Sequence, residues 1–68
     1  MSNMKRYHWN EDTIGYFVDL YETDGMEHMI NRILEFVKYE CTLEDGETHQ
    51  DLNIDLILRV HEEIEKNN

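Results

Sequence analysis

The middle of the chain has the most regular spacing of apolar and polar residues. Between Met26 and Cys41 the apolar positions recur every three or four residues, which at about 100° per residue places them on one side of a helix. Asp24, followed three residues later by Glu27, has the spacing of a capping box. We therefore expect an amphipathic helix over about 26–41. Its apolar side consists of Met26, Met29, Ile30, Ile33, Leu34, Phe36, Val37 and Cys41.

The last part of the chain has a second apolar stripe with helical spacing, made of Leu52, Leu56, Ile57, Val60 and Ile64. Asp55 precedes Arg59, and Glu62 precedes Lys66, by four residues, an arrangement of acid and base that stabilises a helix. Residues 52–60 also alternate as a strand would. The length of the stripe and its continuation to Lys66 favour a helix over about 51–66.

This C-terminal helix carries more apolar residues than its stripe contains. Ile54 and Leu58 lie outside the stripe and nearer to His61. A helix that is apolar on more than one side packs between two neighbours or faces a partner chain. Ile54, Leu58 and His61 are therefore the residues that we expect at a self-association surface.

The first part of the chain fits two different structures. In a helix over about 11–22, Asn10 is the N-cap, and Trp9 and Ile14 form a hydrophobic staple around it. In the other structure, apolar residues alternate from Ile14 to Leu20, Gly15 disfavours a helix, and residues 6–9 pair with 14–21 in a β-hairpin. The cap signals and the acidic face agree with the helix, which we favour.

Two glycine-containing breaks, Asp24-Gly25 and Glu44-Asp45-Gly46, separate these three segments and are typical of helix ends and turns. The 68 residues contain no repeat and no linker, so we expect a single domain over 1–68 with an N-terminal arm over 1–9. The predicted fold class is all-α, a small three-helix bundle. The alternative is an α+β fold in which an N-terminal β-hairpin is followed by two helices.

The charge of the chain indicates what kind of partner it meets. Six Lys and Arg stand against sixteen Asp and Glu, a net charge of −10. The chain lacks the clustered cations that direct nucleic-acid binding needs, and no apolar run approaches the ~20 residues of a membrane span. Residues 1–9 also lack the apolar stretch of a secretory signal. With one free thiol, these features predict a cytoplasmic protein with a protein partner.

Residues that carry chemistry in other proteins are present without the patterns that chemistry needs. Cys41 falls on the apolar side of the middle helix, where a free cysteine behaves as a small hydrophobe. Three isolated glycines form no phosphate-binding loop, and the acids follow solvent faces instead of a cleft. No two histidines have the spacing of metal ligands on one helical turn: His8, His28, His49 and His61. We expect no catalytic residue, metal or cofactor, and predict that the protein is not an enzyme.

The acidic faces are the main candidate for function. Rows of carboxylates on a small scaffold can stand in for DNA phosphates and occupy a Lys- and Arg-lined surface of another protein. We expect an inhibitor or regulator of a basic, nucleic-acid-binding partner. Its size and charge are of the kind found in small virus-encoded inhibitors, which act in the host cytoplasm. Tyr7 and Trp9 are candidate aromatic anchors. The acids assigned to the surface are Glu11, Asp12, Asp19, Glu22, Glu44, Asp45, Glu47, Asp51, Asp55 and Glu62.

The alternative function is that of a self-associating helical module or complex subunit. Pairing two chains through Ile54, Leu58 and His61 would bury the second apolar strip and double a small core. The acids would then serve only solubility. The two hypotheses are not exclusive, because an acidic homodimer can also mimic DNA.

Overall fold

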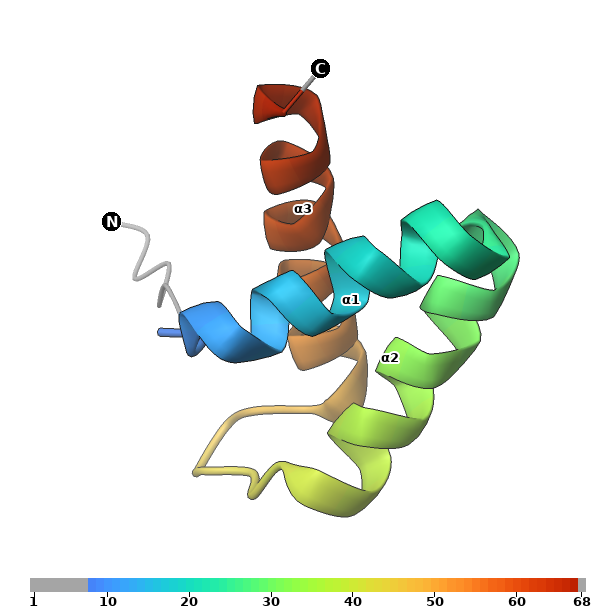
Figure 1. Ribbon diagram of the computed structural model, residues 1–68. Helices are drawn as coiled ribbons and strands as arrows, with labels where there is room; N and C mark the ends of the chain where they lie inside the picture. The colour runs from blue at the N-terminus through green and yellow to red at the C-terminus, as the bar shows by residue number, and fades with distance from the viewer. Residues whose placement is uncertain (1–7, 68) are drawn as a thin grey trace.

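The computed structural model describes residues 8–67 and contains three helices, α1 (Glu11–Asp24), α2 (Met26–Glu40) and α3 (His49–Lys66). Each helix packs against the other two, and α1 crosses α3 while α2 lies to one side (Figure 1). The prediction of an all-α three-helix bundle is confirmed. The β-hairpin alternative is wrong, because residues 14–21 lie inside α1. The predicted N-terminal arm falls mostly outside the described residues.

The start of α1 follows the predicted cap. Asn10 has an extended backbone, and its side-chain oxygen accepts a hydrogen bond from the backbone N–H of Asp12 at 2.7 Å. Glu11 and Asp12 in the first turn place negative charge at the positive end of the helix dipole. The favourable first turn offsets the cost of Gly15, about 1 kcal/mol relative to Ala inside a helix.

A single glycine joins α1 to α2, and this corrects the predicted capping box. Gly25 has φ +96°, a value that L side chains rarely adopt, and its N–H donates to the carbonyl of Tyr21 at 2.9 Å. Gly25 is also the N-cap of α2 and has no side chain to cap with. Asp24 is the last residue of α1, so it does not cap α2.

The connection from α2 to α3 moves two helix ends from their expected places. α2 ends at Glu40, one residue early, because Cys41 is extended. α3 begins at His49, two residues early, because the hydroxyl of Thr48 accepts from the N–H of Asp51 at 3.1 Å and acts as the N-cap. The apolar stripe begins only at Leu52, so hydrophobic periodicity did not indicate the first turn.

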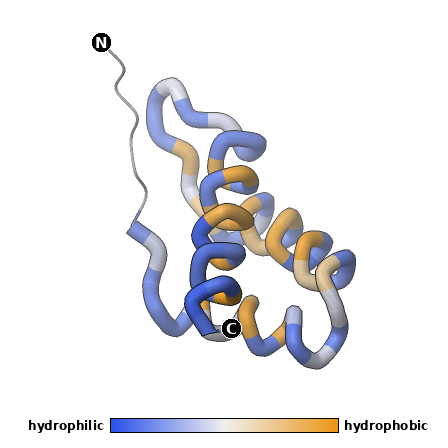
Figure 2. The backbone as a smooth tube through the Cα atoms, turned by 90° about the horizontal axis from the view of Figure 1, so that it is seen from above, coloured by the Kyte–Doolittle hydropathy of each residue, from blue (hydrophilic) through white to orange (hydrophobic). Residues whose placement is uncertain are grey.

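All three helices contribute to one apolar core, and Figure 2 shows hydrophobic and hydrophilic stretches alternating along each of them. Phe17, Ile33 and Leu56 are among the most deeply buried side chains. Met26 and Leu34, predicted on the apolar side of α2, are exposed at its edges. In this three-helix domain, α1 and α3 cover a narrower arc of α2 than the arc over which its apolar residues are spread. The buried residues are Ile14, Phe17, Val18, Met29, Ile33, Val37, Leu52, Leu56, Val60 and Ile64.

Candidate functional site

Every carboxylate of the chain belongs to the part that the structure describes, and none of them is buried. The clearest group runs along the outer side of α1. Its four members are exposed and fall within about 100° of helix circumference, on an arc that contains none of the buried residues of α1. None of these four side chains bonds to a described residue. We call this group the α1 acidic row: Glu11, Asp12, Asp19 and Glu22.

A second acidic group lies on the α2–α3 connection, seen below α1 in Figure 1, and in the first turn of α3. Gly46 has φ +82°, and the side chain of Glu47 folds back to accept from the N–H of Glu44 at 2.8 Å. The N–H of Glu47 in turn donates to the carbonyl of Glu44 at 3.0 Å. The carboxylate of Glu47 therefore stabilises the backbone of the turn to which it belongs. We call this group the loop acids: Glu44, Asp45, Glu47 and Asp51.

The structure assigns Asp55 a role that differs from the predicted one. Its Oδ2 accepts a hydrogen bond from the indole N–H of Trp9 at 2.6 Å, across 46 residues of sequence, and Asp55 is half-buried. It therefore ties the residue before Asn10 to α3 and does not stand on an exposed row. Trp9 also packs against the core, and its role as an anchor for a partner stays a prediction. Tyr7 lies outside the described residues.

The predicted ion pairs of α3 are also rearranged. Arg59 donates to Glu63 at 2.9 Å and not to Asp55, and no ion pair joins Glu62 to Lys66 among the described residues. The hydrogen bond from Arg59 lowers the pKa of Glu63 below its ordinary value. Glu62 itself is exposed, as predicted.

A groove of about 320 Å³ runs between α1 and α3 and contains both acids and bases. Glu11 and Asp19 line it from α1, and Arg59 and Lys66 line it from α3. Glu63 also lines the groove from α3, so the two cations stand among acids of both helices. Sequence reasoning missed this, although the spacing of seven places both bases on one side of α3.

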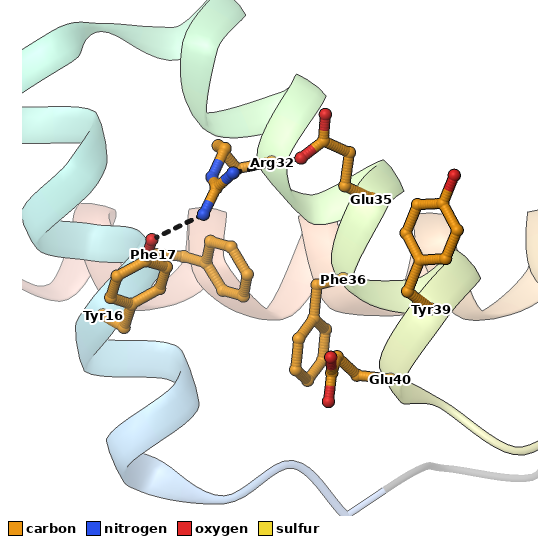
Figure 3. A pocket seen from close by; sticks show the side chains of 7 residues that line it. All are labelled: Tyr16, Phe17, Arg32, Glu35, Phe36, Tyr39 and Glu40. Carbon is orange, nitrogen blue, oxygen red and sulfur yellow. Dashed lines mark hydrogen bonds and ion pairs between the residues drawn. The ribbon is translucent and has the colours of Figure 1, made fainter.

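Between α1 and α2 lies a hollow of about 250 Å³ that sequence reasoning did not anticipate (Figure 3). We call it the aromatic hollow, because four rings line it. Tyr16 and Phe17 come from α1, and their ring centroids are 5.0 Å apart in an edge-to-face arrangement. Phe36 and Tyr39 come from α2, and Phe36 meets Phe17 edge-to-face at 5.6 Å. The periodicity of each helix placed these rings near its apolar side, but only the crossing of α1 and α2 brings them together.

Arg32 closes one end of the aromatic hollow (Figure 3). Its guanidinium donates to the hydroxyl of Tyr16 at 3.3 Å and to the carboxylate of Glu35 at 3.0 Å. The hydrogen bond with Tyr16 is the main cause that raises the pKa of Arg32, and the electrostatic interactions with Tyr16 and Glu35 add to it. Glu40 lines the hollow without a hydrogen bond or ion pair to any described residue. The hollow thus holds one cation of its own and one free carboxylate.

The residues predicted for self-association are all on the surface. Ile54 is 49 % exposed and Leu58 59 %, which agrees with their predicted position outside the core stripe. His61 is also exposed, with Nε2 3.7 Å from a carboxylate oxygen of Glu65.

The remaining reactive groups do not assemble. In residues 8–67 no three His, Cys, Asp or Glu side chains gather in a way that could hold a metal ion. Cys41 is half-buried against the core, and this burial raises the pKa of its thiol. No helix within the described residues is both long and apolar enough to cross a membrane.

No protein-family model, no curated protein and no solved structure matches this chain.

Proposed function

We propose that this protein is a small acidic binding module that occupies a basic, nucleic-acid-binding surface of a partner protein and so inhibits or regulates it. The observation that carries the proposal is the charge of the surface. Sixteen carboxylates stand on it unburied, and the described residues hold only four Lys and Arg to offset them. Two of those cations, Arg32 and Arg59, are engaged in pairs within their own helices.

The spacing of the acids supports mimicry of a nucleic acid backbone. Along α1 the acidic row runs from Glu11 to Glu22, eleven steps of about 1.5 Å each, or about 16 Å. Duplex DNA carries one charge per ~1.7 Å of axis, so a basic groove that fits DNA offers several cations over this length. Unscreened like charge also costs stability, and a basic partner relieves that cost while the attraction speeds association.

We propose that the protein acts in the cytoplasm, which is the host cytoplasm if a virus encodes it. A free thiol is compatible with that reducing compartment. The loop acids and the α1 acidic row act as two separate contacts, one at the α2–α3 connection and the start of α3, the other along α1.

The test is affinity capture of the tagged protein from a nuclease-treated cell lysate, with elution by stepped salt and then by duplex DNA. We expect one dominant nucleic-acid-binding protein that duplex DNA releases and a neutral polymer does not. The variant E11Q/D12N/D19N/E22Q loses this partner. The control D24N/E27Q/E65Q removes exposed charge outside the α1 acidic row, the loop acids and the hollow between α1 and α2, and retains the partner. Recovery of the same proteins by both variants, or no release by DNA, contradicts the proposal.

A second candidate function, self-association, has one observation in its favour. Ile54 and Leu58 expose two neighbouring apolar side chains on α3. Charge opposes it, because each copy brings −10. Sedimentation equilibrium separates the two: a dimer that I54Q/L58Q converts to monomer favours self-association, whereas a monomer in both proteins excludes it.

A further inference from the structure

We infer that the aromatic hollow between α1 and α2 binds the guanidinium group of an arginine side chain on the partner. This inference rests on the proposed function and names the side chain that the partner inserts. Three observations carry it: the size of the hollow, its rings with one free carboxylate, and the way it already holds the protein's own cations.

The size of the hollow suits one side chain. Its volume of about 250 Å³ lies below the ~300–1,000 Å³ of pockets that bind small-molecule ligands. The floor is apolar, because Phe17 is fully buried and Phe36 is half-buried. The rim is open, with Tyr39 71 % exposed. A long side chain with an apolar stem and a charged tip fits this arrangement.

The free end of the hollow has the groups that recognise a guanidinium. Phe36 and Glu40 are four residues apart on α2 and therefore lie on one side of the helix. Figure 3 shows them at the end of the hollow away from Arg32. A planar guanidinium stacks on an aromatic face and pairs with a carboxylate at once, which a lysine ammonium does less well.

Two of the protein's own cations already contact tyrosines that line the hollow. Arg32 bonds to the hydroxyl of Tyr16, and Lys38 Nζ lies 5.3 Å from the ring centroid of Tyr39. Both tyrosines line the hollow. The charge of Arg32 is offset by Glu35, so Glu40 leaves the hollow with a net charge of −1 for an incoming cation.

The test compares two blocked peptides, acetyl-Gly-Ser-Arg-Ser-Gly-amide and the same peptide with neutral citrulline. Trp9 reports binding by fluorescence, because it is the chain's only tryptophan and its ring lies 6.5 Å from Phe36. Aromatic NMR shifts locate the peptide. The titration is run at about 0.15 M ionic strength, where long-range attraction is screened beyond about 8 Å.

We expect the arginine peptide to bind about tenfold more tightly than the citrulline peptide, and to shift the resonances of Tyr16, Phe36 and Tyr39. E40Q removes the difference between the peptides. The matched control E22Q removes one charge from the α1 acidic row and retains the difference. Far-UV circular dichroism checks that both variants are folded.

Equal binding of the two peptides, shifts that fall on the loop acids instead, or no binding at millimolar peptide overturns the inference. The proposed function is judged separately, by DNA-released capture of a partner. If capture succeeds and the peptide test fails, the acidic surface binds a partner that does not use the hollow. If the peptides behave as expected and capture fails, the hollow is an arginine site whose protein is not a nucleic-acid mimic.

Discussion

The two flanks of α1 pack against their neighbours by different physical means. On the α2 flank, Phe17 and Tyr16 meet Phe36 and Arg32, and the contact is mostly between aromatic rings. On the α3 flank, smaller aliphatic residues pack beside a groove of charges, and one indole–carboxylate hydrogen bond joins Trp9 to Asp55. Burial therefore stabilises the α2 flank, whereas the α3 flank depends in part on charged groups and responds more to pH.

The largest effect is expected from the ring at the centre of the α2 flank. Phe17→Ala removes a side chain that is 1 % exposed and empties the floor of the aromatic hollow. We expect a loss of about 3–5 kcal/mol in the free energy of unfolding, enough to unfold much of a 68-residue domain. Thermal unfolding followed by circular dichroism measures it.

The matched change on the α3 flank is Val18→Ala. It removes two methyl groups from a buried residue beside the groove and should cost about 1–2 kcal/mol. Equal losses for the two variants would mean that the α2 flank does not hold the larger share of the packing energy, and the comparison would fail.

An intermediate effect is expected from the bond between Trp9 and Asp55. Trp9→Phe keeps a ring against the core but removes the N–H donor, and a hydrogen bond to a charged group contributes about 1.5–3 kcal/mol. Urea unfolding of W9F, D55A and the double variant gives the coupling energy of the pair. We expect a coupling of at least about 0.5 kcal/mol; strictly additive losses would show that the bond does not stabilise the fold.

The hydrogen bond between Trp9 and Asp55 is also an example of a contact that the sequence alone could not predict. The apolar repeats of α2 and α3 predicted both helices, and Asn10 was recognised as a cap, because these signals act within a few residues. Thr48 was not recognised, since the first turn of α3 is polar. Trp9 and Asp55 are 46 residues apart, and no local pattern indicates that they meet.

The features of the candidate site likewise divide into those that a single helix determines and those that depend on how two helices pack. The exposure of the α1 acidic row was predictable, because those acids lie outside the apolar stripe of the same helix. The position of Arg59 and Lys66 beside this row was not predictable, because it depends on which side of α3 faces α1. The aromatic hollow likewise exists only where α1 crosses α2, and Tyr16 and Tyr39 belong to different repeats.

The smallest effect is the pH response of the α3 flank. Arg59 lowers the pKa of Glu63 below 4.5, so the folded state binds its proton less tightly than the unfolded state. This pair therefore contributes stability above pH 4.5, and the contribution is lost as the pH falls through the lowered value. Melting temperatures of the wild type and E63Q, measured from neutral to acidic pH, should converge as Glu63 is protonated. E62Q removes a neighbouring carboxylate that forms no ion pair with a described residue, and it serves as the control for the loss of one negative charge. Parallel curves for E63Q would show that Arg59 contributes no pH-dependent stability, and that the two flanks of α1 do not differ in their response to acid.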